Sequence, residues 1–193
     1  MTHLEETVSV MKLRHVPPRW DSIRSVLFLD YDGVLHRGDA YRTKRGIVSS
    51  DPSRIQLFEY AELLAEILDP YPDVEIVLST SWVKALGFNR ARDALPVEAL
   101  WERVVGATYH TRFHDAHRWH DISRGAQVAR YVYRHHLIKW LALDDHADGF
   151  EAVRSNLVLC DIENAIGEAD VQVTLKAALR EAFHGASNVS ITN

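Results

Sequence analysis

Short runs of apolar residues recur along the chain, and several of them end abruptly at polar residues. The first reads Ser-Val-Leu-Phe-Leu and stops at Asp30. Continuous apolar runs of this length are typical of strands that are buried on both faces of a parallel sheet. On this pattern we expect five strands, at residues 25–29, 74–78, 104–107, 140–143 and 156–160.

Segments with helical spacing alternate with these runs. Asp51, with Pro52 after it, is a suitable N-cap for a helix that continues to Leu68 and ends before Pro70. Ser123 is expected to cap another helix, a further helical region is expected between the strands at 74–78 and 104–107, and residues 174–183 predict a closing helix. This alternation of strands and helices predicts an α/β fold with a mostly parallel central sheet.

The length of 193 residues fits one domain, which we place at residues 21–185. Residues 1–20 are expected to form an N-terminal extension and residues 186–193 a C-terminal tail, and both can be mobile. No apolar run approaches the ~18 residues that span a bilayer, so no membrane role is expected. A single cysteine, Cys160, excludes an internal disulfide and suits a reducing cytoplasm, where we expect the protein.

Charge is distributed unevenly along the chain. The formal net charge is -5, which argues against a protein that coats nucleic acid nonspecifically. Residues 103–139, however, hold seven Lys and Arg against two Asp, together with six His. A locally basic segment in an acidic protein predicts an anionic ligand rather than a general polyanion surface.

Three of the expected strands end in polar clusters that can bind a metal and a phosphate. Because ligands of an open parallel sheet bind beyond the carboxyl ends of its strands, we expect the three clusters to converge on one site. Carboxylates brought this close repel one another, and a hard divalent cation, best Mg²⁺, relieves the repulsion with oxygen ligands. The clusters are Asp30-Tyr31-Asp32-Gly33, Ser79-Thr80-Ser81 and Asp144-Asp145.

The sequence Leu-Asp-Tyr-Asp-Gly-Val-Leu at residues 29–35 resembles the first motif of the haloacid dehalogenase-like (HAD) superfamily. Ser79 or Thr80 resembles the second motif and Arg124 the third, in which lysine is more usual. Asp144-Asp145 resembles the acidic fourth motif, so the likeness covers roughly residues 24–165. Phrases such as Val-Leu-Ser-Thr-Ser-Trp and Ala-Leu-Asp-Asp further resemble the compact HAD domains of bacterial RNA-repair proteins.

This resemblance implies a Rossmann-like three-layer sandwich and a role for each motif residue. Asp30 would be the nucleophile, and Asp32 the acid-base residue that protonates the leaving oxygen and then activates water. Ser79 or Thr80 would hold the phosphoryl oxygens together with Gly33, and Arg124 would offset charge in the transition state. The metal would be bound by Asp30, Asp32, Asp144 and Asp145.

Several assignments stay open at the level of sequence. Asp144 with Asp148 fits the superfamily's alternative spacing, so the direct metal ligand among the acids at 144, 145 and 148 is undetermined. The histidines at 110, 114, 117 and 120 suggest zinc, but without thiolates or regular spacing we expect a polar loop or a substrate-side surface. Tyr109, Phe113 and Trp119 could stack on bases or belong to the local core.

Too few residues separate the motifs for a large cap domain, so we expect an open site with a short flap around residues 36–49. An open site admits the phosphate at the end of a large substrate. The sequence thus predicts a Mg²⁺-dependent phosphatase, acting on nucleotide or polynucleotide phosphate ends, with a role in RNA repair. The alternatives are a phosphatase of small phosphorylated metabolites and a non-catalytic, Mg²⁺-dependent phosphate-binding module.

Overall fold

A computed structural model describes residues 24–44, 46–112 and 118–184. The predicted N-terminal extension and C-terminal tail therefore lie outside the described residues, as do His114, His117 and Phe113 of the basic segment. No helix in the described part of the chain is long and apolar enough to cross a membrane.

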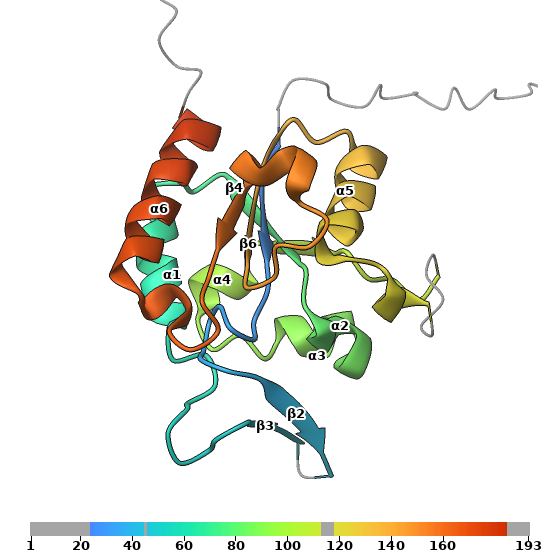
Figure 1. The fold of residues 1–193 in the computed structure, drawn as a ribbon, viewed down its shortest axis with the longest axis vertical. Helices are drawn as coiled ribbons and strands as arrows, with labels where there is room; N and C mark the ends of the chain where they lie inside the picture. Colours follow the sequence, from blue (N-terminus) through green and yellow to red (C-terminus); the bar gives the residue numbers. More distant parts are fainter. Residues whose placement is uncertain (1–23, 45, 113–117, 185–193) are drawn as a thin grey trace, which may run out of the picture.

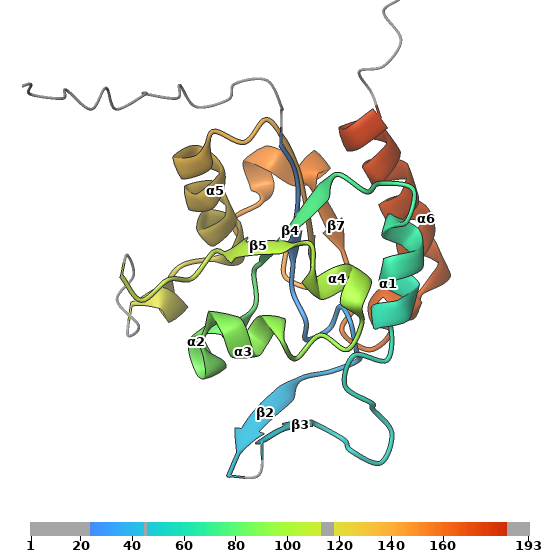
Figure 2. The same cartoon turned by 180° about the vertical axis from the view of Figure 1, so that it is seen from behind.

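Five parallel strands form the central sheet, in the order β5-β4-β1-β6-β7 (Figures 1 and 2). Leu29 at the end of β1 is in register with Leu78 on one side and Leu143 on the other. The predicted parallel α/β sheet is thereby confirmed, with β1 at its centre. The strands are β1 (Ser25–Leu29), β4 (Val74–Leu78), β5 (Val104–Ala107), β6 (Lys139–Asp144) and β7 (Leu157–Leu159).

Helices cover both faces of the sheet and make three layers. Leu27 and Leu29 of β1 pack in the same cluster as Leu64 of α1 and Leu175 of α6, whereas Phe28 on the other face packs with α5. The alternation follows from the period of two along a strand. The α-helices are α1 (Ala61–Leu68), α2 (Ser81–Leu86), α3 (Phe88–Arg92), α4 (Glu98–Trp101), α5 (Arg124–His135) and α6 (Ala169–Leu179).

Shorter helical turns complete the described chain. Three are 3₁₀ turns, and one is a π-helical turn that extends α6. They are η1 (Trp119–Asp121), η2 (Glu151–Asn156), η3 (Ala165–Gly167) and the π turn η4 (Arg180–His184).

An antiparallel hairpin of β2 (Ala40–Thr43) and β3 (Gly46–Ser49) extends beyond the sheet on the side of α2 and α3 (Figure 1). The Arg42 guanidinium donates a hydrogen bond of 2.7 Å to the backbone carbonyl of Ala85, which fixes the hairpin against α2. In the described residues nothing larger is inserted between the motifs, and the absence of a large cap domain is confirmed.

The helix predicted to start at Asp51 begins instead at Ala61. The Asp51 carboxylate accepts hydrogen bonds from the backbone N–H and hydroxyl of Ser53, so it closes a local turn. Phe58 has a positive φ of 60°, and its ring packs against those of Tyr31 and Trp82. These tertiary contacts override the helical spacing of residues 51–60. The closing helix also differs, because α6 starts at Ala169 rather than at residue 174.

Candidate active site

The predicted site residues lie at the carboxyl edge of the sheet because the strand ladders continue past the strand ends. The Asp30 backbone N–H donates to the Leu143 carbonyl at 3.1 Å, and the Ser79 N–H donates to the Leu29 carbonyl at 2.8 Å. The ends of β4, β1 and β6 are thus held level with one another. All three polar clusters predicted to converge are therefore neighbours.

Arg124 connects these three strand ends through its guanidinium group. One amino group lies 2.7 Å from Asp30 Oδ2, and Nε lies 3.1 Å from Asp144 Oδ2. The other amino group donates to the Ser79 carbonyl at 2.6 Å. Burial lowers the pKa of Arg124, but the carboxylates of Asp30 and Asp144 outweigh this and raise it. Arg124 therefore stays charged inside the site.

Two glycines bring the start of α5 against the loop that follows β6. A Cβ on Gly125 would lie 2.1 Å from the carbonyl group of Gly149, and the Gly125 N–H donates to the Asp148 carbonyl at 2.9 Å. The Asp148 carboxylate accepts the Arg124 backbone N–H at 3.3 Å. Asp148 thus holds the N-terminus of the helix that carries Arg124, and its carboxylate is not in the group of side chains placed to share a metal.

Four side chains are close enough to bind one metal ion. Ligand atoms of Asp30, Asp144, Asp145 and His146 all lie within 4.8 Å of one another. His146 was not predicted as a site residue, although it directly follows the fourth motif. Its ring Nδ1 lies 2.6 Å from Asp145 Oδ1, and its backbone N–H donates to Asp144 Oδ1 at 3.0 Å.

This group fits a hard divalent cation, because three of its members offer carboxylate oxygens. The pKa of Asp30 is raised to about 6, because burial and the nearby Asp32 and Asp145 raise it by more than Arg124 lowers it. Burial and Asp30 also raise the pKa of Asp144 well above its usual range. One guanidinium group therefore does not offset the buried negative charge, and a bound cation would complete the balance.

The Asp32 carboxylate lies outside this group and is held by two unpredicted residues. The Trp82 indole N–H is 3.2 Å from each carboxylate oxygen, and His36 Nε2 is 3.1 Å from Oδ1. His36 is fully buried, and its Nδ1 has no partner in the described structure. A proton on Nε2 makes this contact a hydrogen bond to the Asp32 carboxylate. In the sequence, these two residues were marked only by their positions near motif residues: His36 lies four residues after Asp32, and Trp82 directly follows Ser-Thr-Ser.

The remaining motif residues shape the turns around the site. Gly33 has a φ of 63°, and a Cβ there would lie 2.6 Å from Asp145 Oδ2, so glycine lets Asp145 approach the turn. The Thr80 hydroxyl accepts the Trp82 backbone N–H at 3.3 Å and caps α2. The Ser79 hydroxyl is buried without a partner among the described residues. Both hydroxyls thus remain candidates for the second motif.

Part of the basic segment borders the site, and part of it is core. Trp119, Arg124, His146 and five other residues line a pocket of about 260 Å³ beside the acidic group. Tyr109 and Trp119 are buried and pack edge to face, with ring centroids 5.2 Å apart, so they belong to the core. The His110 ring accepts the Arg112 backbone N–H at 3.0 Å. Within the described part of the chain, the acidic group at Asp30 is the sole candidate metal site.

At the carboxyl edge of its parallel sheet the protein has an Asp-x-Asp turn, the buried guanidinium group of Arg124 and a second acidic pair. This combination defines a HAD-like protein. Comparison with protein families agrees: the chain belongs to the family described as the HAD domain in Swiss Army Knife RNA repair proteins, which matches residues 26–171. No curated protein and no solved structure matches the chain. The resemblance seen in the sequence is confirmed, and membership implies a Mg²⁺-dependent phosphohydrolase.

Proposed function

We propose that this protein hydrolyses phosphate monoesters through a phosphorylated Asp30, and that its substrates are the phosphate ends of nucleotides or polynucleotides. The observation that carries the proposal is the contact of Arg124 with both Asp30 and Asp144 at the acidic group. It combines a buried carboxylate, a fixed positive charge and a cation site at one edge of the sheet, which phosphoryl transfer needs.

In the first step a carboxylate oxygen of Asp30 attacks phosphorus and the bond to the leaving oxygen breaks. Arg124 lies beside Asp30 Oδ2, so it orients the nucleophile and offsets charge on the phosphoryl oxygens. The Ser79 or Thr80 hydroxyl donates to one of those oxygens. Asp32 gives its proton to the leaving oxygen, which departs as an alcohol. A Mg²⁺ ion held by Asp30, Asp144 and Asp145 would supply further neutralisation of the phosphoryl charge.

In the second step water attacks the phosphorus of the phosphorylated Asp30. Asp32 takes a proton from that water, and the bond between phosphorus and the Asp30 oxygen breaks. Inorganic phosphate leaves, Asp30 returns as a carboxylate, and Asp32 is protonated again. The Trp82 and His36 contacts suit this role, because they orient the Asp32 side chain while its carboxylate remains 18% exposed.

Three features support a phosphorylated end as the substrate. The hairpin over residues 40–49 is a small flap, so a large substrate can approach the site. The family's description refers to RNA repair proteins. The chain is also basic between residues 103 and 139, although its net charge is negative. A nucleic-acid end joins a transferable phosphate to further negative charge and satisfies all three features.

Phosphate release from a substrate panel tests this proposal. The purified protein with Mg²⁺ would be offered mononucleotides, oligonucleotides phosphorylated at either end, phosphopeptides and p-nitrophenyl phosphate. We expect the highest kcat/KM on a nucleotide or oligonucleotide phosphate. Turnover of mononucleotides but never of oligonucleotide ends would favour a small-metabolite phosphatase. Tight Mg²⁺-dependent binding without any phosphate release would favour a binding module.

A further inference from the structure

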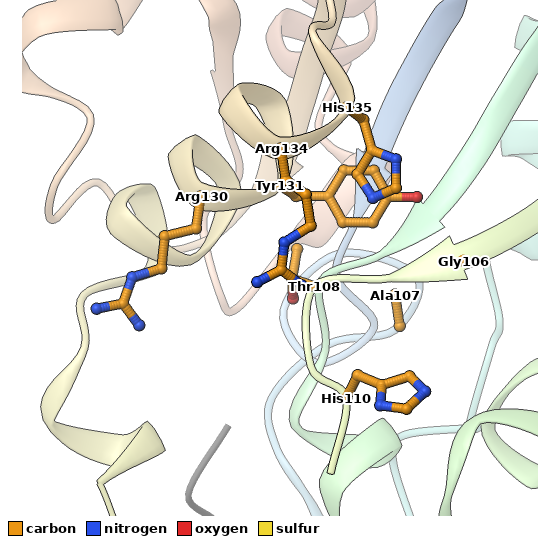
Figure 3. Close-up of a pocket in the computed structure, with 8 residues that line it drawn as sticks. All are labelled: Gly106, Ala107, Thr108, His110, Arg130, Tyr131, Arg134 and His135. Carbon is orange, nitrogen blue, oxygen red and sulfur yellow. The ribbon is translucent and has the colours of Figure 1, made fainter. Parts of the chain in front are cut away.

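A second pocket, of about 340 Å³, lies between the edge strand β5 and helix α5 (Figure 3). It shares no lining residue with the pocket beside the acidic group. Small residues at and just after the end of β5 form one side of the pocket, and long polar side chains from α5 form the other. The lining residues are Gly106, Ala107, Thr108, His110, Arg130, Tyr131, Arg134 and His135.

Two guanidinium groups lie among the described residues that line this β5–α5 pocket. Arg130 and Arg134 are four residues apart on α5 and therefore share a face, and Figure 3 shows Arg134 reaching toward Thr108. Glu75 is the carboxylate that acts on Tyr131, and it is bound by Arg24 at 2.6 Å. An anionic ligand in the pocket would lie beside two guanidinium groups, which bind phosphate through charge-assisted hydrogen bonds.

The rest of the lining suits a flat ring. A Cβ on Gly106 would lie 2.7 Å from the Tyr131 hydroxyl, so the glycine lets the tyrosine lie directly against the strand. The Tyr131 ring stacks on His135, with centroids 4.1 Å apart and planes 24° apart. Aromatic surface beside guanidinium groups is the combination that binds single-stranded nucleic acid, through base contacts and phosphate pairing.

The pocket and the active site are joined by short structural links. The Thr108 N–H donates to the Leu78 carbonyl at 2.9 Å, and the next residue, Ser79, accepts the Arg124 guanidinium. Along α5, Arg130 and Arg134 lie ~9 and ~15 Å from Arg124 at the helical rise of 1.5 Å per residue. Phosphates in one strand are spaced by ~3.4 Å or more. A strand whose end lies at Asp30 can thus reach the pocket within a few nucleotides.

We propose that the β5–α5 pocket binds a backbone phosphate and base of a single-stranded nucleic acid whose terminal phosphate enters the site at Asp30. Arg130 and Arg134 pair with the phosphate, and the base lies against the side chain of Tyr131. This inference rests on the proposed function and gives it a second contact with the substrate. It makes a single strand, rather than an isolated phosphate, the ligand that the protein prefers.

Binding and turnover of short oligonucleotides test the inference separately. Binding is measured by fluorescence anisotropy with a labelled single strand that has hydroxyl groups at both ends, so hydrolysis is not involved. The variant is Arg130→Gln with Arg134→Gln, and the matched control is Arg154→Gln with Arg180→Gln, which removes the same charge from other elements. Thermal melting checks that both variants fold. Turnover is measured on the phosphorylated strand and on p-nitrophenyl phosphate.

We expect the pocket variant to bind the strand ~10-fold more weakly and to lower the slope of log affinity against log salt by about one, since the contact with one phosphate is lost. Its kcat/KM should fall on the phosphorylated strand and stay unchanged on p-nitrophenyl phosphate. The inference would be overturned if the pocket variant bound the strand as tightly as the unmodified protein, or if the control variant lost as much affinity as the pocket variant. It would also be overturned if polyglutamate displaced the labelled strand as well as an unlabelled strand does. If the pocket variant lost binding while the unmodified protein hydrolysed no substrate, the result would support the pocket and refute the proposed function.

Discussion

At the scale of single residues, the site depends on how one guanidinium group is shared. Arg124 contacts Asp30 and Asp144, while Asp145 and His146 complete the group that can surround a cation. Asp32, two residues from Asp30, has a separate environment with donors from Trp82 and His36. The two aspartates of the first motif thus have different surroundings, which fits the different roles proposed for them, Asp30 as the nucleophile and Asp32 as the acid and base.

Replacement of the nucleophile is the most direct test. Asp30→Asn should abolish phosphate release and leave the fold intact, because an amide cannot form the acyl phosphate and has a similar volume. Phosphate release and the melting temperature measure the two effects. Near-normal turnover in this variant would refute the mechanism, and a beryllofluoride adduct on a residue other than Asp30 would relocate the nucleophile.

Trp82→Phe should lower kcat about tenfold with little change in KM, since a hydrogen bond to a charged group is worth ~1.5 kcal/mol or more. The substitution removes the N–H donor to Asp32 and keeps an aromatic ring. Trp101→Phe on α4 is the matched control and should leave kcat unchanged. Steady-state kinetics on p-nitrophenyl phosphate separate the two constants. A kcat equal to that of the unmodified protein would show that Asp32 needs no such donor.

The raised pKa of Asp30 predicts a pH dependence of stability in metal-free protein. Because burial raises this pKa to about 6, the folded state holds a proton that the unfolded chain releases near pH 4. The group's contribution to stability is present below pH 4 and is lost as pH rises toward 6, by an amount on the order of 1–3 kcal/mol. Asp144 acts in the same direction.

Chemical denaturation with chelator across pH 4 to 7 checks this. Other carboxylates, such as Glu59 with its lowered pKa, act in the opposite direction, so the quantity to compare is the difference between the unmodified protein and Asp30→Asn. That difference should grow in favour of the variant as pH rises. A constant difference across the range would mean that Asp30 titrates alike in the folded and unfolded states.

At the scale of elements, the position of Arg124 is set by the packing of α5 against the loop after β6. Ser123 caps the helix, with its hydroxyl 3.4 Å from the Ala126 N–H, and Gly125 touches the Gly149 carbonyl group closely enough to exclude any side chain. The consecutive residues Ser123, Arg124 and Gly125 thus supply the helix N-cap, the guanidinium group of the candidate site and a packing contact.

Gly125→Ala should therefore damage both stability and activity. The added methyl group would overlap backbone rather than a movable side chain, so we expect a loss of roughly 2–4 kcal/mol and a fall in activity as the helix start shifts. Ala129→Gly on the exposed side of the same helix is a control for backbone effects and should cost about 1 kcal/mol. Equal melting temperatures for the two variants would contradict this account of the contact.

The elements differ in how well the sequence predicted them. Strands β1, β4 and β5 have the predicted bounds, because each is a mainly apolar run that is followed directly by a polar residue, as β1 is by Asp30. Helix α1 was predicted nine residues too early, with its N-cap at Asp51 rather than Tyr60, since a positive φ at Phe58 and a turn at Asp51 depend on ring packing and local hydrogen bonds. Helical spacing contains no information about either.

The same distinction applies to the site. Asp30, Asp144 and Asp145 could be found because they stand at the ends of predicted strands, which topology brings together. Arg124 could be found because it resembles the third motif of the HAD superfamily and starts a helix. His36 and Trp82 could not, because their importance lies in contacts that close only when the first turn packs against α2. Fixed spacing along a chain does not predict which ring will face a carboxylate.

At the scale of the whole molecule, hydrolysis should depend on a hard divalent ion. Chelation should abolish phosphate release, and Mg²⁺ or Mn²⁺ should restore it, since three of the four candidate ligands are carboxylates. Activity and metal content are measured on the same samples. Full activity after exhaustive removal of divalent ions would contradict the prediction, and a tightly held stoichiometric zinc would redirect attention to the histidines of residues 110–120.

The strand order has a consequence for how the molecule is made. Among the described strands, β1 is the first to leave the ribosome and the central one of its sheet, and its neighbours β4 and β6 follow much later in the chain. Until they arrive, β1 has two unpaired edges, which favour association with other chains. A nascent chain that stops before residue 139 has Asp30 but neither β6 nor Asp144. The site is therefore complete only after β6 has been made. Chains interrupted before that point should aggregate through the unpaired edges of β1 and should have no activity.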